Sequence, residues 1–182
     1  MPGITQIRWC GFGGQGVVLA GMLLGEAGAL DGKFVSGSNF YGAQARGSIC
    51  RAEVVLSGEP IDFPHVIETD LLIAMSQGSY ALYCGGVKEH SGIILYDQGQ
   101  VTPKEGLRLR QTGIPATEQA LKRLENKQVA NIVLLGALIK TTKIVSWGSM
   151  EKAIRARVGD RFQHLNLEAF KLGRELGGKG NG

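Results

Sequence analysis

The sequence predicts an α/β fold with a mostly parallel sheet and a helical C-terminal third. Three observations support this prediction. A glycine-rich run at residues 11–16 joins a strand-like segment to a helix-like one, and two apolar runs, residues 70–75 and 93–97, are typical of buried parallel strands. Later apolar residues recur with the 3.6-residue period of helices. At 182 residues we expect a single domain over residues 1–176 and a flexible, glycine-rich tail at 177–182.

The first half of the chain is expected to alternate between strands and one long helix. Ile4, Ile7 and Trp9 mark the first strand, and small and apolar residues dominate the helix that follows the glycine run. A segment without a sustained period, expected to be a loop, then separates two further strands. In chain order we predict a strand over 4–10, a helix over 17–30, a strand over 33–38, a loop over 39–47 and a strand over 48–57.

Polar residues follow both apolar runs of the second half, where parallel sheets tend to bind ligands. Ser76 and Gln77 follow the first run, and Asp97 ends the second. A helix cap explains Ser76 equally well, and a turn explains Asp97. We predict a short helix ending at Tyr83 and helices over 115–124, 129–139 (buried, because it is apolar nearly all round), 149–157 (capped by Ser149) and 162–176. This order is that of a Rossmann-like, three-layer domain.

Composition excludes several classes of protein. The chain is 43% apolar and 20% charged, and no apolar stretch approaches the roughly 20 residues of a membrane span. No secretory leader is visible, so a cytoplasmic location is predicted. The net charge of +4 divides into −4 for residues 1–97 and +8 for residues 98–182, with the cations too scattered to favour nucleic acid. The three cysteines are too far apart for a zinc or iron–sulfur ligand run and are expected to be reduced thiols: Cys10, Cys50 and Cys84.

The glycine run has the G-x-G-x-x-G spacing of a phosphate-binding turn. Gly11 permits a tight turn, Gly13 lets backbone N–H groups approach a ligand, and Gly16 lets the helix pack closely on the strand. A bound anion would also meet the positive end of the helix dipole. The alternative is that these glycines serve packing alone.

The signals of the commonest nucleotide folds are missing. A dinucleotide-binding domain carries an acidic residue at the end of its second strand. This chain has Ser36, Ser38 and Asn39 there, which could bind a nucleotide or form a turn. No Lys-Ser or Lys-Thr follows Gly16, so a P-loop is excluded. We predict no catalytic residue and no metal ligand, because no catalytic set is visible around the three histidines, His65, His90 and His164.

A series of motifs extends along nearly the whole chain. It comprises residues 11–16, Tyr41-Gly42, Arg46-Gly47, residues 70–74, Tyr96-Asp97, and residues 115–117, 131–137 and 166–173. In this order the motifs resemble the gamma subunits of 2-oxoacid:ferredoxin oxidoreductases, most of all the short gamma subunits of the 2-oxoglutarate enzymes.

The resemblance implies a heteromeric complex that oxidatively decarboxylates a 2-oxoacid, here 2-oxoglutarate, to an acyl-CoA and CO2 while it reduces ferredoxin. Thiamine diphosphate, magnesium and iron–sulfur clusters are then expected in partner alpha, beta and ferredoxin-like delta subunits. This chain would contribute coenzyme A binding and subunit packing. The expected contacts to coenzyme A are Gly11, Gly13, Gly14, Gln15, Gly16, Ser36, Ser38, Asn39 and Arg46.

Two other functions fit the residues. One is a stand-alone oxidoreductase that binds a nucleotide cofactor by itself, and the other is a purely structural subunit. Arg46 suits a bidentate phosphate contact and an ion pair at an interface equally well, and Tyr41 is expected at an interface. In isolation we expect an inactive chain that can form a homodimer, because its apolar interface residues would otherwise face water.

Overall fold

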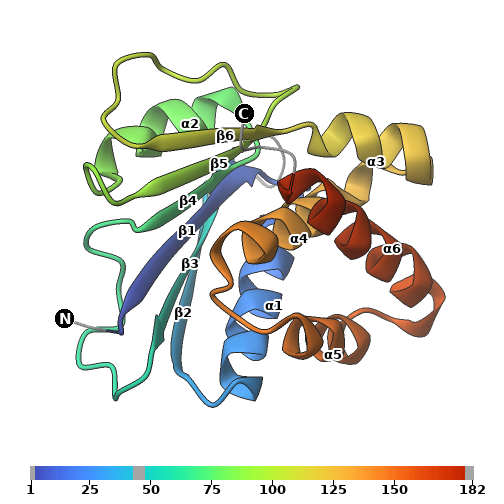
Figure 1. Ribbon diagram of the computed structural model, residues 1–182, viewed down its shortest axis with the longest axis horizontal. Coiled ribbons are helices and arrows are strands. Elements are labelled where there is room, and N and C mark those ends of the chain that lie inside the picture. The colour runs from blue at the N-terminus through green and yellow to red at the C-terminus, as the bar shows by residue number, and fades with distance from the viewer. Residues whose placement is uncertain (1–2, 43–47, 179–182) are drawn as a thin grey trace.

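A six-stranded mixed sheet organises the chain (Figure 1). The computed structural model describes residues 3–42 and 48–178. Within them the strands lie in the order β2-β3-β1-β4-β5-β6. Their bounds are β1 Thr5–Phe12, β2 Phe34–Tyr41, β3 Ile49–Ser57, β4 Leu71–Ala74, β5 Ile93–Asp97 and β6 Arg110–Ile114. Among these residues, no helix combines the length and apolar character needed to cross a bilayer.

The sheet has a parallel part and an antiparallel part. β1 pairs in parallel with β4, and the parallel ladder continues through β5 to β6. On its other side β1 pairs antiparallel with β3, which pairs antiparallel with β2. The prediction of a mostly parallel, Rossmann-like sheet is therefore confirmed, and the antiparallel β3 is an addition that the apolar pattern did not reveal. β2 is an edge strand two positions away from β1.

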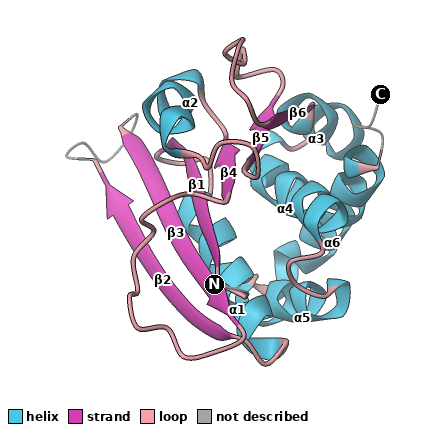
Figure 2. Cartoon of the chain, turned by 60° about the vertical axis from the view of Figure 1, so that its left-hand side comes forward, coloured by secondary structure: helices cyan, strands magenta, loops and turns pink. Residues whose placement is uncertain are grey.

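Helices cover both faces of the sheet unequally (Figures 1 and 2). α2 (Gln77–Tyr83) and the 3₁₀ turn η1 (Cys84–Gly86) lie on one face, over the parallel strands, and leave β2 and β3 without a helix there. The other helices gather on the opposite face. They are α1 Val17–Leu30, α3 Ala116–Leu124, α4 Ala130–Thr142, α5 Trp147–Arg157 and α6 Asp160–Gly177, with the 3₁₀ turn η2 (Lys127–Val129) leading into α4.

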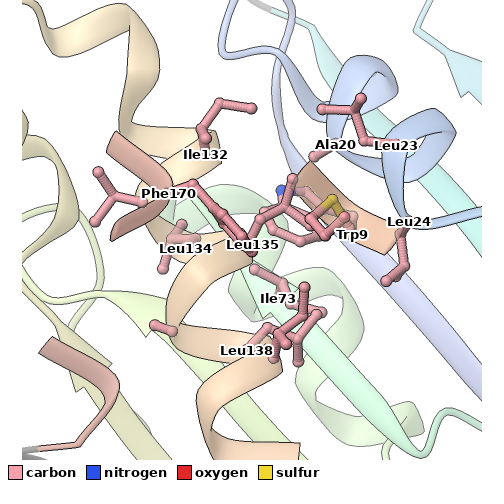
Figure 3. Close-up of a cluster of buried hydrophobic side chains, with 14 of the residues drawn as sticks. Trp9, Ala20, Leu23, Leu24, Ile73, Ile132, Leu134, Leu135, Leu138 and Phe170 are labelled. Atoms are coloured by element: carbon pink, nitrogen blue, oxygen red, sulfur yellow. The ribbon is translucent and has the colours of Figure 1, made fainter. Parts of the chain in front are cut away.

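The main core lies between the sheet and these helices, with α4 at its centre (Figure 3). Leu135 of α4 lies between Trp9 of the sheet and Phe170 of α6, and all three side chains are inaccessible or nearly so. Burial of one such side chain stabilises the fold by about 1.5–3 kcal/mol. The prediction that α4 is buried all round is confirmed from Ala130 to Ile139.

Several boundaries differ from the predicted ones. β2 continues through Tyr41, so the expected loop at 39–47 begins later, and residues 43–47 lie outside the described residues. β6 was not predicted, because a five-residue strand with three polar residues and a glycine has no clear period. Ser146, not Ser149, caps α5, since its hydroxyl accepts the Ser149 N–H. α6 ends at Gly177, one residue into the predicted tail, whose residues 179–182 are not described.

Candidate functional site

The glycine run forms a tight loop between β1 and α1, at the carboxyl edge of the parallel strands. Gly14 (φ 97°) and Gly16 (φ 73°) adopt left-handed backbone conformations that favour glycine. Two backbone hydrogen bonds fold the loop: Gln15 N–H donates to the Phe12 carbonyl at 3.1 Å, and Gly13 N–H donates to the Ser48 carbonyl at 3.1 Å. The loop is therefore held both by its own turn and by the start of β3.

The Gln15 side chain fixes this loop from within. Its Oε1 accepts the Phe12 N–H at 2.6 Å, and its Nε2 donates to the Met75 carbonyl just beyond β4 at 2.9 Å. Both ends of the amide are thus engaged inside the protein. Gln15 was predicted to contact a ligand, which stays a prediction; its amide braces the loop through these two hydrogen bonds.

Close packing leaves no room for a side chain at Gly11 or Gly16. A Cβ at Gly11 would lie 2.5 Å from Gln15 Oε1, and one at Gly16 would lie 2.3 Å from Asn131 Nδ2. Asn131 donates to the Gly16 carbonyl at 3.0 Å and is 2% exposed. Sequence reasoning did not assign Asn131 a role in the loop, although a lone amide in an apolar helix is a signal, because buried polar groups need partners.

Gly14 is the open position of the loop, and two cavities meet there. One, of about 300 Å³, lies toward β4 and includes Gln15, Thr117 and Lys127 in its lining. The other, of about 380 Å³, lies toward α6 and includes Gly16, Asn131 and Arg157. A Cβ at Gly14 would meet no atom within 4 Å.

Backbone donors face this region. Among the described residues, the N–H groups of Gly14 and Gly16 find no acceptor. The first turn of α1 has neither a side-chain cap nor an acidic residue, so its N–H groups and dipole are available to an anion. Lys127 lines one cavity and Arg157 the other, but Arg157 is ion-paired with Glu26 at 2.5 Å, so Lys127 and the backbone donors are what suit a negatively charged group at Gly14.

The second strand does not join this site. Ser36 and Ser38 lie on the sheet face opposite α1, and the Ser36 hydroxyl donates to the Pro64 carbonyl at 3.0 Å. Asn39 lines a separate groove of about 380 Å³ beside α1. β3 occupies the place next to β1 where a dinucleotide fold has its second strand, which separates these residues from the glycine loop by two strand positions. Arg46 lies outside the described residues.

Asp97 and Ser76 have structural roles at the same edge. Asp97 is fully buried and accepts the Thr117 N–H at 3.2 Å and the Thr117 hydroxyl, so it caps α3, whose N-cap residue, Pro115, makes no side-chain hydrogen bond. Burial raises the pKa of Asp97, and the hydrogen bonds offset this only in part. Ser76 caps α2 by accepting the Ser79 N–H. Asp97 also holds Thr117, which lines the cavity toward β4.

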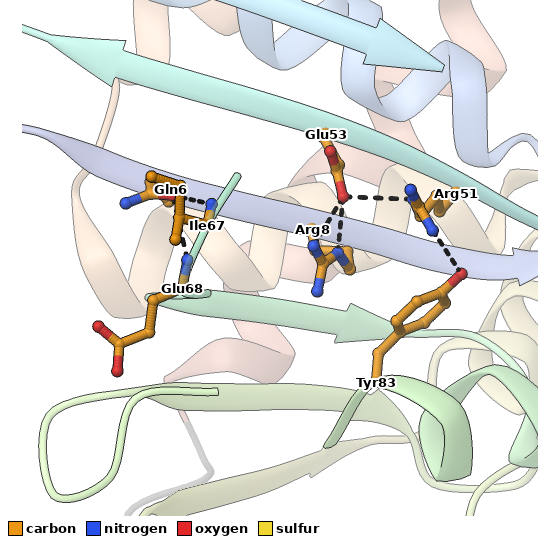
Figure 4. A network of polar contacts seen from close by, with 7 residues as sticks. All are labelled: Gln6, Arg8, Arg51, Glu53, Ile67, Glu68 and Tyr83. Atoms are coloured by element: carbon orange, nitrogen blue, oxygen red, sulfur yellow. Dashed lines mark hydrogen bonds and ion pairs between the residues drawn. The ribbon is translucent and has the colours of Figure 1, made fainter. Parts of the chain in front are cut away.

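A buried charge network lies on the α2 side of β1 and β3 (Figure 4). Glu53, 4% exposed, binds Arg8 at 2.7 Å and Arg51 at 3.2 Å. Arg51 also donates to the Tyr83 hydroxyl at 3.1 Å and lies over the Phe40 ring at 3.8 Å. This network joins β1, β2, β3 and α2, and two cations share the single carboxylate of Glu53.

The titratable residues offer no further site. Within the described residues, no group of three or more His, Cys, Asp or Glu side chains could hold a metal ion. The three cysteines are free and buried, and burial raises the pKa of Cys10 to about 12. A further cavity of about 440 Å³, lined in part by Lys33, Lys140 and Arg174, lies at the opposite edge of the sheet.

Comparison with known proteins identifies the family. The sequence profile of the pyruvate ferredoxin/flavodoxin oxidoreductase family matches residues 6–176. The 2-oxoglutarate synthase subunit KorC of Methanocaldococcus jannaschii is 45% identical over 174 residues, which cover 94% of this chain and 92% of that one. The gamma subunit of a keto/oxoacid ferredoxin oxidoreductase from Geobacter sulfurreducens PCA has a crystal structure with a TM-score of 0.88 at 35% identity, covering 98% of both chains.

A second solved structure shares the fold alone. The 2-oxoglutarate:ferredoxin oxidoreductase from Magnetococcus marinus, with 2-oxoglutarate, coenzyme A and succinyl-CoA bound, has a TM-score of 0.87 at 23% identity over 98% of this chain and 32% of that one. The profile match and the KorC relationship extend over nearly the whole length. The chain belongs to the pyruvate ferredoxin/flavodoxin oxidoreductase family, as a gamma-type subunit.

Proposed function

We propose that this chain is the gamma subunit of a 2-oxoglutarate:ferredoxin oxidoreductase, in which it binds coenzyme A and packs against the catalytic subunits. The 45% identity to KorC over nearly the full length supports 2-oxoglutarate as the substrate of the complex. We assign thiamine diphosphate, magnesium and the iron–sulfur clusters to alpha, beta and delta partners, with ferredoxin as the acceptor. The chain alone has no turnover under this proposal.

The observation that carries the coenzyme A assignment is the open position at Gly14. Of the residues predicted around the loop, Gln15 braces it from within, and Gly11 and Gly16 leave no room for a side chain. Gly14 alone combines free space, an unpaired N–H and two adjoining cavities. We place a phosphate group of coenzyme A there, at the N-terminus of α1.

The cavities hold only part of such a ligand. Volumes of about 300 and 380 Å³ lie at the low end of ligand pockets, which span about 300–1,000 Å³. The role of this chain is therefore to anchor one charged end of coenzyme A, with Lys127 and Arg157 near the two cavities, while partner subunits hold the rest. The braced loop binds and orients, and no residue of this chain enters the bond-making steps.

A pair of substitutions at Gly14 tests the phosphate contact. Gly14→Asn and Gly14→Asp place side chains of the same shape in open space, and both residue types tolerate left-handed backbone better than most. Only Gly14→Asp adds negative charge. We expect Gly14→Asp to weaken coenzyme A binding about tenfold more than Gly14→Asn at low salt, with the difference shrinking at high salt.

The measurement is calorimetric titration of the assembled complex with coenzyme A, after size-exclusion chromatography has shown intact assembly. Equal affinities for the two variants would remove the loop from the coenzyme A site and favour the purely structural subunit, whose case rests on the packing of Gly11 and Gly16. Copurification from the native organism tests the complex independently. A chain recovered without thiamine-binding and iron–sulfur partners would contradict membership, and NAD or flavin turnover by the chain alone would support the stand-alone oxidoreductase.

A further inference from the structure

The edge strand β2 lacks three of the features that usually protect a sheet edge, since it is neither short, nor charged, nor interrupted by proline; the segment after β3 touches it on one face, where the Ser36 hydroxyl donates to the Pro64 carbonyl. Native edges are kept apart by short strands, charged side chains, prolines or a covering element. β2 has eight residues, Phe-Val-Ser-Gly-Ser-Asn-Phe-Tyr, with no charge and no proline. Figure 2 shows it as the outermost strand at its side of the sheet.

The free hydrogen-bonding groups of β2 belong to its odd-numbered residues. Gly42 N–H donates to the Ile49 carbonyl at 3.2 Å, and the β2–β3 register continues from this pair. Even-numbered residues of β2 therefore bond to β3, and the N–H and C=O groups of odd-numbered residues point to the open edge. Among the described residues no partner is found for those of Val35, Gly37, Asn39 and Tyr41.

The sequence of β2 is self-complementary about Gly37. Ser36 and Ser38 flank it on one face of the strand, and Phe34 and Phe40 lie one step further out on the same face. An identical strand running antiparallel about a two-fold axis at Gly37 would set phenylalanine opposite phenylalanine and serine opposite serine. The odd-numbered residues would then meet in hydrogen-bonded pairs, Gly37 with the partner's Gly37 and Val35 with the partner's Asn39.

We propose that two copies of this chain associate through their β2 strands, antiparallel about a two-fold axis at Gly37, and so form one continuous sheet of twelve strands. An isologous interface needs a self-complementary surface, and β2 supplies one in both its backbone donors and its side-chain order. A different partner strand would not require the symmetry about Gly37.

Apolar side chains on both sides of the edge extend this surface. Phe34 and Phe40 are 47% and 38% exposed on the face opposite α1, and Met22 and Leu30 of α1 are 42% and 52% exposed. Tyr41, at 71%, stands at the end of the strand, where interface burial was predicted for it. The Ser38 hydroxyl has no hydrogen-bond partner among the described residues, and the pairing sets the partner's Ser36 opposite it.

Cysteine cross-linking of the purified full chain tests the register. In the proposed pair the two Gly37 Cα atoms lie about 5.5 Å apart, within disulfide range, whereas the two Asn39 Cα atoms lie about 14 Å apart, since four residues of about 3.4 Å separate them along the strand. A Cβ at Gly37 would have only the Glu53 carbonyl within 4 Å, at 3.8 Å, so Gly37→Cys fits the fold. The native cysteines are buried.

We expect Gly37→Cys to give a covalent dimer on mild oxidation, and Asn39→Cys and the unchanged chain to give none. No dimer with Gly37→Cys, or equal cross-linking of Asn39→Cys, would overturn the proposal. Gly37→Pro provides a second measurement, because it removes an N–H that points to the open edge and leaves the β2–β3 bonds intact. Sedimentation velocity should show a dimer for the unchanged chain and a monomer for Gly37→Pro with an unaltered circular dichroism spectrum. A monomeric unchanged chain would also overturn the proposal.

Discussion

Gly14 and Gly16 lie in the same loop, but their surroundings differ in the space they leave for a side chain. Gly16 is enclosed, because a Cβ there would approach Asn131 Nδ2 to 2.3 Å, whereas Gly14 has no atom within 4 Å of that position. Both have positive φ, so both pay a conformational penalty on substitution. Stability should therefore separate the two residues, although the G-x-G-x-x-G pattern treats them alike.

Substitution of each glycine by alanine measures this difference. We expect Gly16→Ala to reduce the free energy of unfolding by about 2–4 kcal/mol, because backbone strain adds to a clash with Asn131. Gly14→Ala should cost about 1 kcal/mol from strain alone. Urea denaturation of the purified chain checks both values, and equal losses would show that Asn131 moves aside at no cost.

Asp31 links the end of α1 to the start of α5. Its carboxylate accepts the Ser149 hydroxyl at 2.6 Å and the Ser146 N–H at 2.5 Å. Partial burial raises the pKa of Asp31, but these hydrogen bonds and Lys33 lower it by more, so the pKa lies below its usual 3.8. A lowered folded-state pKa means that the ionised carboxylate stabilises the fold above the unfolded pKa, and that this contribution is lost as the pH falls through the folded value.

Asp31→Asn should therefore destabilise the chain by about 1 kcal/mol at pH 7, a modest value because the group is partly solvated. The difference from the unchanged chain should begin to narrow below about pH 4, where the carboxylate of the unfolded chain is protonated, and should shrink further as the pH falls through the lower folded-state pKa of Asp31. Thermal or urea unfolding across pH 3 to 7 provides the measurement, with the exposed Asp62→Asn as control. A pH-independent difference would contradict the ionic origin of the effect.

At the scale of elements, glycines set the distance between α4 and α6. A Cβ at Gly173 would lie 2.0 Å from the Val133 carbonyl oxygen, and one at Gly136 would lie 2.2 Å from the Phe170 carbonyl oxygen. These obstacles are backbone atoms, which cannot rotate away. The two helices are therefore in backbone contact, and α6 can cover α4 only with glycine at these places.

Gly173→Ala should lower the free energy of unfolding by about 3 kcal/mol or more, because the helices must separate to admit the methyl group. Gly148→Ala in α5 is the matched control, since a Cβ there meets nothing within 4 Å. It should stabilise the chain by about 0.5–1 kcal/mol through helix propensity. Chemical denaturation tests both, and a neutral Gly173→Ala would show that the interface is looser than its geometry indicates.

Prediction from sequence succeeded where an element carries its own periodic signal. The strand over 93–97 was predicted at its observed bounds, and the buried α4 followed from a helix that is apolar all round. β6 was not predicted, because its polar residues hide the alternation of a strand. The antiparallel pairing of β3 was not predicted either, because the alternation of apolar residues does not depend on the direction in which a strand pairs. Ser149 was predicted as the cap in place of Ser146, because serine suits an N-cap at either position.

The site was predictable only as a loop. The glycine turn and its place before α1 followed from spacing, but Asn131 and Asp97 reach their positions through the tertiary fold. Ser36, Ser38 and Asn39 were grouped with the loop because a dinucleotide fold sets its second strand beside its first. In this molecule β3 lies between β1 and β2, and nothing in the local sequence indicates that a strand is inserted there.

At the scale of the whole molecule, the two functional surfaces lie apart. The glycine loop opens toward α4 and α6, whereas β2 forms the far edge of the sheet. Paired β2 strands would leave both glycine loops accessible to other subunits. The number of gamma subunits in the complex is then expected to be even, with each anchoring one coenzyme A.

The hydrogen bond from Asn131 to the Gly16 carbonyl spans 115 residues of sequence. Contacts of such separation form late in folding, because the loop-closure entropy between them must be overcome first. The β2–β3 hairpin, in contrast, pairs near neighbours in sequence and can form early. We therefore expect the glycine loop to acquire its final shape only when α4 docks, so that under the proposed function anion affinity would appear together with the native core.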